Sequence, residues 1–178
     1  EDRRILIVGD FDADGATASV VAIKALRLMG AKYVDFLVPN RFKHGYGLSP
    51  EIVNEAKLKK EPNLIITVDN GISSNEGAAL ARSLGIDVII TDHHLPPKEL
   101  PDANAIINPN LRGCDFPSKN LAGVGVCFYL FSSLKTHLDS IGYFEKYNIK
   151  VPDLRVLLDL VALGTVADVV KLDQNNRI

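Results

Sequence analysis

Short apolar runs alternate with longer, mixed segments along most of this chain. The runs are rich in Ile, Val and Leu and have the length of buried strands. They cover residues 5–8, 33–38, 64–68, 88–91 and 105–107. Between them, apolar positions recur at helical spacing, with cap signals such as Ser49-Pro50 and Ser74-Asn75 and a stop at Gly30. These segments predict helices over residues 15–29, 50–60 and 75–85.

The second half of the chain has a different distribution of apolar and polar residues. Residues 96–119 are rich in Pro, Asn and Asp and predict a segment that is largely loop. Two apolar stretches follow, and they predict helices over residues 121–138 and 154–163, the second ending at Gly164. Because strand and helix alternate at least four times, the predicted fold class is α/β, with a mostly parallel sheet and helices on both faces.

Composition narrows the class of protein. The chain has 178 residues, 47 % of them apolar and 24 % charged, which is typical of one soluble globular domain. A net charge of −2 gives no global basic signature of nucleic-acid binding. Cys114 and Cys127 form neither a disulfide framework nor a zinc motif, so the expected compartment is the reducing cytoplasm. The apolar runs are too short or too interrupted to span a membrane.

Acidic residues follow three of the predicted strands. Asp10 comes one glycine after the first strand, Asp69 directly follows the third, and Asp92 directly follows the fourth and precedes His93 and His94. Ligands of open parallel sheets collect outside the carboxyl ends of the strands. A single Asp at a strand end is usually a turn or cap residue, but three core strands ending this way predict a shared site at that edge.

The segment GDFDADG places Asp10, Asp12 and Asp14 close together, where they repel one another unless a cation lies among them. Asp168 lies in the apolar stretch GTVADVV, where an acid needs a partner. Carboxylates mixed with imidazole suit Mn²⁺, Mg²⁺, Zn²⁺ or Fe²⁺, and Mn²⁺ is the natural compromise. With more than four acids, we expect two ions that clamp a phosphate between them.

The segment GDFDADGAT is open to three other interpretations. The spacing matches the start of a calcium-binding EF-hand loop, but the twelfth position is Val21 where a Glu is needed, and a strand precedes the loop. A phosphatase of the haloacid-dehalogenase type requires D-x-D-x-T, which is one residue out of step here. A non-catalytic receiver or nucleotide-binding module leaves the two histidines unexplained.

Four ordered segments, GDFDADG, VDNG, TDHH and GTVADV, resemble the motifs of the DHH phosphoesterase superfamily. The intervening VPNRFKHGYGLSP, DNGISS, AIINPN and LAGVGV look like its bacterial RecJ branch, the single-strand-specific 5′→3′ DNA exonucleases. The resemblance covers essentially the whole chain. RecJ-like proteins also carry a DHH-associated domain and an oligonucleotide-binding barrel, so residues 1–178 are expected to be the isolated catalytic DHH domain. The helices from about residue 121 would form a subdomain or a linker to the second domain.

The resemblance implies roles for particular residues. Metal ligands fall on Asp12, Asp14, Asp69, His93 and Asp168. His94 would face the phosphate or orient the attacking water, and Asp10 and Asp92 would support the catalytic site by holding ligands in place. Many superfamily members have a metal-binding His four residues before the middle Asp of the first motif. That position is Val8 here, which cannot ligate, so Asp10 or water would compensate.

The loop RFKHGYG follows a predicted strand and therefore lies near the same edge of the sheet. Arg41 and Lys43 would meet phosphate, His44 belongs to the same cluster, and Tyr46 would stack on a base. Gly47, like Gly45, would let the backbone approach a DNA strand. A glycine-rich surface turn with incidental charge is the structural alternative, and the resemblance favours substrate contact.

The resulting hypothesis is a Mn²⁺- or Mg²⁺-dependent 5′→3′ exonuclease on single-stranded DNA, acting in repair and recombination. The expected protein is a cytoplasmic monomer with no membrane partner, working with other repair proteins such as a helicase and a single-strand-binding protein. Two alternatives stay open. One is a DHH phosphoesterase that hydrolyses pyrophosphate, short oligonucleotides or cyclic dinucleotides. The other is a metal-binding module without turnover.

Overall fold

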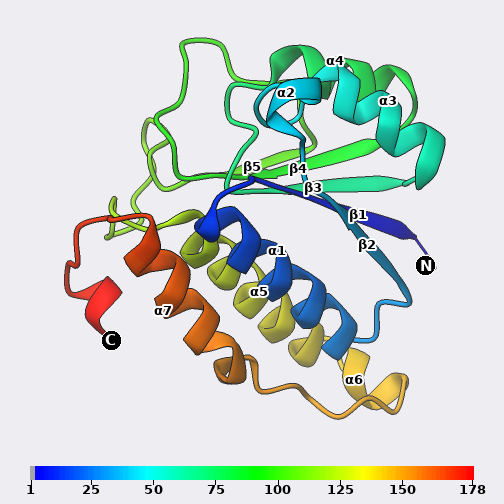
Figure 1. Ribbon diagram of the computed structural model, residues 1–178. Helices are drawn as coiled ribbons and strands as arrows, with labels where there is room; N and C mark the ends of the chain where they lie inside the picture. Colours follow the sequence, from blue (N-terminus) through cyan, green and yellow to red (C-terminus); the bar gives the residue numbers. More distant parts are fainter. Residues whose placement is uncertain (1–2) are drawn as a thin grey trace.

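The computed structural model describes residues 3–178, except for the side chains of Arg41 and Lys43. These residues form a single five-stranded sheet in which every neighbouring pair is parallel, in the order β2-β1-β3-β4-β5 (Figure 1). The strands are β1 (Arg4–Gly9), β2 (Tyr33–Leu37), β3 (Leu64–Val68), β4 (Asp87–Thr91) and β5 (Ala105–Ile107). The α/β fold class and all five expected strands are therefore confirmed.

Helices cover both faces of the sheet, as the alternating pattern predicts. The helices are α1 (Ala13–Leu28), α2 (Arg41–His44), α3 (Pro50–Lys59), α4 (Asn75–Ser83), α5 (Gly123–Ser140), α6 (Tyr143–Lys146) and α7 (Leu158–Ala167), with 3₁₀ turns η1 (Leu154–Leu157) and η2 (Asn175–Arg177). In Figure 1, α3 and α4 lie on one side of the sheet and α1, α5 and α7 on the other. The short α2 and α6 escape sequence analysis because one helical turn has too few residues to show a period.

Two apolar cores separate the layers. One lies between the sheet and α1 and α5, and it contains Val21, Val124 and Phe131. The other lies between the sheet and α3 and α4, and it contains Leu48 and Ile52. The helices after residue 121 share the first core with α1, so α5 belongs to the helical layer that covers this face of the sheet.

The end of the chain differs from the prediction in one respect. The helix expected over 154–163 begins as η1, becomes α7 at Leu158, and runs through Gly164 to Ala167. Gly164 is a buried helical residue rather than a helix stop, because it is a contact point between helices. A Cβ built on Gly164 would lie 2.3 Å from Thr17 Oγ1 in α1 and 2.8 Å from Val124 Cγ1 in α5.

Gly164→Ala is therefore expected to destabilise the protein, by about 1–3 kcal/mol of unfolding free energy. A loss of stability would identify the contact between helices as its cause, because Gly to Ala within a helix ordinarily stabilises by about 1 kcal/mol. Urea unfolding followed by circular dichroism measures the change. Gly125→Ala in α5 is the control, since its Cβ would meet nothing nearer than the flexible Leu121 side chain at 3.1 Å. A Gly164→Ala variant as stable as the wild type would show that the helices can separate freely.

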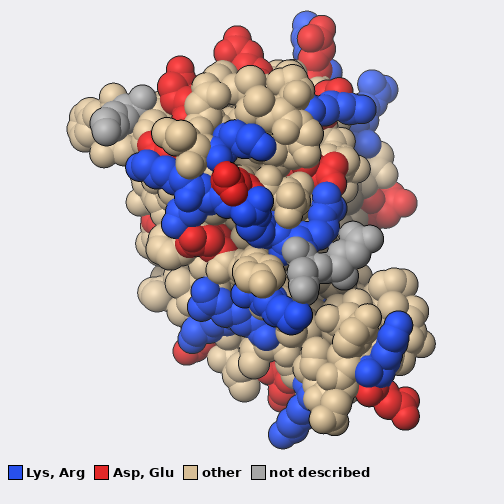
Figure 2. Space-filling model, turned by 90° about the vertical axis from the view of Figure 1, so that its right-hand side faces the viewer, with Lys and Arg blue, Asp and Glu red and all other residues tan. Residues whose placement is uncertain are grey.

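Charged side chains at the amino ends of the strands neutralise one another. Figure 2 shows this face, where Lys and Arg are interspersed with acidic residues. Arg4 pairs with Glu61 at 2.9 Å, Lys60 with Asp35 at 2.6 Å, and Arg3 with Asp87. No helix within residues 3–178 has both the length and the apolar character needed to cross a membrane.

Candidate metal centre

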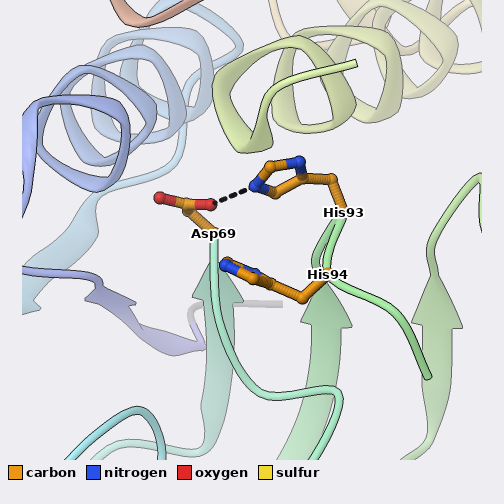
Figure 3. Close-up of side chains that lie close together, drawn as sticks. All are labelled: Asp69, His93 and His94. Atoms are coloured by element: carbon orange, nitrogen blue, oxygen red, sulfur yellow. Dashed lines mark ion pairs between the residues drawn. The ribbon is translucent and has the colours of Figure 1, made fainter. Parts of the chain in front are cut away.

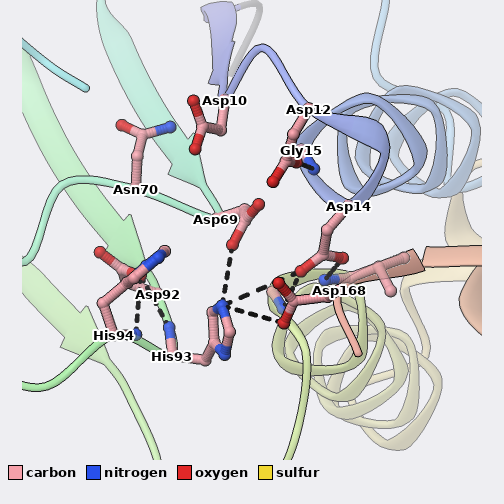
Figure 4. A network of polar contacts seen from close by, with 12 residues as sticks. Asp10, Asp12, Asp14, Gly15, Asp69, Asn70, Asp92, His93, His94 and Asp168 are labelled. Carbon is pink, nitrogen blue, oxygen red and sulfur yellow. Dashed lines mark hydrogen bonds and ion pairs between the residues drawn. The ribbon is translucent and has the colours of Figure 1, made fainter. Parts of the chain in front are cut away.

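The predicted acidic residues meet at the carboxyl ends of β1, β3 and β4. Asp10, Asp69 and Asp92 follow these strands, and His93 and His94 continue from Asp92 (Figures 3 and 4). Asp12 caps the amino end of α1 by accepting a hydrogen bond from Gly15 N at 2.9 Å, and Asp14 lies in the first turn. Asp168 comes from the other end of the chain, as the C-cap residue directly after α7. Within the described residues, all candidate metal ligands therefore share one site.

The centre of this site is a group of polar atoms without hydrogen-bond partners. Within residues 3–178, His93 Nε2, Asp69 Oδ1 and Asp168 Oδ2 are buried and make no hydrogen bond. His93 Nε2 lies 3.2 Å from Asp69 Oδ1, 3.5 Å from Asp168 Oδ2 and 4.0 Å from Asp14 Oδ2. Atoms that bind one cation at about 2.1 Å and at right angles lie about 3 Å apart, so this convergence fits a shared ion.

Asp69 belongs to two potential ligand sets. It groups with His93 and His94, and it also groups with Asp10 and Asp12, each set having ligand atoms within 4.8 Å of one another. A third set consists of Asp14, His93 and Asp168. Overlapping sets that share Asp69 and His93 are the arrangement expected for two neighbouring ions. Asp10 therefore has the position of a ligand as well as of a support.

The electrostatics of the cluster also favour a cation. Burial, together with the carboxylates of Asp14 and Asp12, raises the pKa of Asp69 to about 10. Burial likewise raises the pKa values of Asp14 and Asp168. Among the described side chains, the ion-pair partner of all three acids is one residue, His93, rather than a Lys or Arg. A divalent cation would remove the repulsion and restore the ionised carboxylates, so the residues present fit a metal.

Asp92 holds the two histidines in place. Its Oδ1 accepts hydrogen bonds from His93 N at 2.8 Å and His94 N at 3.1 Å, and it contacts His94 Nδ1 at 2.7 Å. Its Oδ2 accepts from Ile72 N at 2.9 Å. Burial alone would raise the pKa of Asp92, but these bonds lower it below the ordinary value. The bond to Asp92 in turn raises the pKa of His94, and it leaves Nε2 of a neutral His94 as the acceptor nitrogen.

Backbone strain marks the same place. Asp69 has φ of +63° and Val169, directly after Asp168, has φ of +58°. Left-handed backbone is uncommon for Asp and a clear outlier for β-branched Val. Strain of this kind persists only where the surrounding structure enforces it, and it concentrates at functional sites. Both strained residues lie at the ends of elements that deliver candidate ligands.

Sequence reasoning missed the asparagines that fix the strand ends. Asn70 is fully buried, and its Nδ2 donates to Val8 O at 3.0 Å and Val68 O at 2.9 Å, which ties β1 to β3. Asparagines beside proline, as in the segment NPN, are typical of turns. Asn108 Nδ2 instead donates to His94 O at 2.9 Å, and Asn110 Nδ2 donates to His93 O at 2.6 Å. The available signal was their position directly after β5, at the edge where the other ligands lie.

The structure places some of the predicted substrate-binding residues beside the metal ligands and others away from them. Tyr46 lies beside the metal ligands, with its ring edge-on to His94 at 6.2 Å and to Phe11 at 6.1 Å. Its hydroxyl donates to Asp10, and burial together with Asp10 raises the pKa of Tyr46. Gly47 has φ of +67°, which suits glycine and shapes the turn that presents Tyr46.

The geometry of His44 favours a structural role. His44 Nδ1 accepts a hydrogen bond from Asn40 N at 3.0 Å, and Nε2 lies 3.0 Å from Glu55 Oε2. Both ring nitrogens are thus engaged within the α2–α3 region, so the substrate contact of His44 stays a prediction. The side chain of Arg41, another predicted contact, lies outside the described part of the chain.

Comparison with known proteins agrees with this geometry. The model of the DHH family, N-terminal domain, matches residues 4–165, which include every candidate ligand except Asp168. The chain belongs to the DHH family. As a DHH domain, it brings the segments TDHH, VDNG and GDFDADG together at one sheet edge, as the positions of their acids after the strands predicted.

The DHH domain has similar relatives along its whole length. It is 62 % identical to the single-stranded-DNA-specific exonuclease RecJ of Escherichia coli and 45 % identical to that of Bacillus subtilis, over 178 residues in each case. The chain spans 31 % of the first protein and 20 % of the second. A crystal structure of exonuclease RecJ bound to manganese superposes with a TM-score of 0.79 at 34 % identity, covering 99 % of this chain and 41 % of that one.

Val8 occupies the position at which the resemblance to the superfamily would place a metal-binding His. The Val8 side chain is completely buried in the core beneath α3 and α4, with Leu48 and Ile52. It therefore faces apolar groups and cannot ligate, as expected. Asp10, two residues further along, groups with Asp12 and Asp69 and has the carboxylate oxygens to compensate.

Proposed function

We propose that this chain is the catalytic DHH domain of a longer exonuclease that hydrolyses single-stranded DNA from its 5′ end. The observation that carries the proposal is the convergence of three buried atoms that make no hydrogen bond, His93 Nε2, Asp69 Oδ1 and Asp168 Oδ2. The relatives named as single-stranded-DNA-specific exonucleases support the choice of substrate. Because the chain spans under a third of those relatives, the activity is proposed for the longer protein of which it is part.

Two divalent cations, Mn²⁺ or Mg²⁺, are proposed as the cofactors. The residues that would hold them are Asp10, Asp12, Asp14, Asp69, His93 and Asp168. When bound, such ions supply an activated water and stabilise charge on phosphoryl oxygens. A neutral His94 orients the attacking water by accepting its proton or hydrogen bond at Nε2, while Asp92 fixes the ring through Nδ1. Ile72 N in turn fixes the Asp92 carboxylate.

The experiment that tests the function uses a single strand labelled at either end. The chain and the longer protein are incubated with Mn²⁺, with Mg²⁺ or with EDTA. Release of labelled mononucleotide from the 5′ end at the earliest times, dependent on metal and absent on duplex DNA, is the expected result. Manganese binding without release by the longer protein would leave a binding module. Hydrolysis confined to pyrophosphate or cyclic dinucleotides would indicate a different phosphoesterase.

Tyr46 is proposed to stack on a base of the bound strand. Tyr46 is 52 % exposed although its hydroxyl is anchored by Asp10, so a partly exposed ring is held beside His94. Tyr46→Ala is expected to weaken binding of a short labelled strand about 10–100-fold, since one stacked base contributes about 1–3 kcal/mol. Fluorescence anisotropy in EDTA measures this without hydrolysis. Tyr46→Phe keeps the ring and should retain most of the affinity, and equal affinities for Ala and Phe would contradict stacking.

We also propose how the longer protein works. It is expected to act as a cytoplasmic monomer in repair and recombination, with a helicase and a single-strand-binding protein supplying and protecting its substrate. Light scattering of the purified longer protein tests the monomer. Stimulation of nucleotide release by a helicase on blunt duplex DNA tests the partnership, and identical rates with and without the helicase would oppose it.

A further inference from the structure

The first turn of α5 holds Asp14, a candidate metal ligand that belongs to a different helix, α1. Gly123 N donates to Asp14 Oδ2 at 2.6 Å and Val124 N donates to Asp14 Oδ1 at 2.9 Å, although Asp14 precedes them by 109 and 110 residues. Ala122, the residue before α5, makes no side-chain cap. Asp14 therefore serves as the cap of α5, and the positive end of the α5 dipole compensates its buried charge.

The same turn lies directly against a second candidate ligand. A Cβ built on Gly123 would lie 2.4 Å from both Cβ and Oδ1 of Asp69, closer than side-chain carbons come to other atoms in proteins. Asp69 cannot easily yield, because its backbone is held at φ of +63° and its N–H donates to Thr91 O at 3.0 Å. Only glycine at position 123 permits this contact.

These two contacts involve carboxylates on either side of His93. Its Nε2 lies 3.2 Å from Asp69 and 4.0 Å from Asp14, so the position of α5 sets how closely the two acids approach the same nitrogen. The acids repel each other, and a free Asp14 would swing away from Asp69. A binding site whose ligands are already held in place loses less entropy when it binds its ion.

We propose that Gly123 is a positioning residue that preorganises the metal centre, holding Asp14 through its N–H and admitting Asp69 through its missing side chain. This inference rests on the proposed metal centre. An added methyl group must displace either Asp69 or the first turn of α5, and the second movement also breaks the bonds to Asp14. Supporting contacts of this kind typically change metal affinity about 10–100-fold.

The test compares Gly123→Ala with Gly125→Ala in the longer protein. Gly125 is two residues along the same helix, and its Cβ would meet no atom nearer than the Leu121 side chain at 3.1 Å. Isothermal titration calorimetry with Mn²⁺ is expected to show at least about tenfold weaker binding for Gly123→Ala and wild-type binding for Gly125→Ala. Nucleotide release by Gly123→Ala should recover as Mn²⁺ is raised, which a general loss of folding would not allow.

A second measurement uses the wild-type chain, so it does not depend on whether the variant folds. Titration of ¹⁵N-labelled protein with diamagnetic Mg²⁺ is expected to shift the amide resonances of Gly123 and Val124 with the same midpoint as that of Asp69, while Gly125 moves little. Unchanged Gly123 and Val124 resonances at saturating Mg²⁺, or equal Mn²⁺ affinity of Gly123→Ala and wild type, would overturn the inference. Failure of the wild-type protein to bind either Mn²⁺ or Mg²⁺ would instead contradict the proposed function.

Discussion

Replacing Asp69 by Asn is expected to abolish nucleotide release while leaving the metal-free protein at least as stable as the wild type. Asp69 is common to two of the three potential ligand sets, so the change weakens both ion sites at once. The metal supplies several kcal/mol of transition-state stabilisation, and about 1.4 kcal/mol corresponds to a factor of ten. We therefore expect a loss of about a thousandfold or more.

The stability part of this prediction follows from the sign of the pKa shift. The pKa of Asp69 is raised to about 10, so the ionised carboxylate is disfavoured in the folded, metal-free state. A group with a raised folded pKa destabilises the fold once the pH exceeds its unfolded value, and at pH 7 this penalty is present. Neutral Asn removes it. Thermal melts in EDTA should accordingly give an equal or higher midpoint for Asp69→Asn.

Asp139→Asn is the matched control for Asp69→Asn. Asp139 is an exposed acid near the far end of α5, a helix of 18 residues and about 27 Å. The control should keep wild-type turnover, manganese binding and melting temperature. Turnover by Asp69→Asn within tenfold of wild type would remove Asp69 from the catalytic centre. A large drop in its metal-free stability would mean that the buried carboxylate is structural.

Substitutions of the adjacent histidines His93 and His94 are expected to have large but different effects. His93 Nε2 lies among three carboxylates and has no hydrogen bond, whereas His94 is bonded to Asp92 and its side chain is 46 % exposed. His94→Ala is therefore expected to lower kcat about a hundredfold or more, the usual contribution of a proton-handling group, with Mn²⁺ affinity within about threefold of wild type. His93→Ala should instead weaken Mn²⁺ binding by more than about a hundredfold, because loss of a ligand exceeds loss of a support.

Two assays separate these roles. Calorimetry with Mn²⁺ measures affinity, and nucleotide release at saturating Mn²⁺ measures kcat. His137→Ala is the control, because His137 lies in the last turn of α5, away from the metal ligands. If His94→Ala lost manganese as severely as His93→Ala, then His94 would be a metal ligand within the Asp69-His93 set rather than the residue that orients water.

Much of the site was predictable because strand ends are local features. The end of a buried β-branched run in the sequence marks the end of its strand, and parallel strands bring their ends to one edge of the sheet. Asp10, Asp69 and the segment from Asp92 to His94 could therefore be placed together from the pattern alone. Asp168 was recognised as an acid in need of a partner. Its position was not predictable, because it depends on how closely α7 packs against α1 at Gly164.

The sequence by itself determined the five strands and the longer helices, which edge of the sheet carries the acids and which ion chemistry those acids suit. Each of these follows from residues adjacent in the chain or from the regular geometry of a parallel sheet. Tertiary structure alone decided that α5 holds Asp14 and touches Asp69, that both nitrogens of His44 are engaged and that Asn108 and Asn110 fix the histidine backbone. These contacts join residues that are close only after the helices pack, and their distances depend on side-chain volumes that no local pattern encodes.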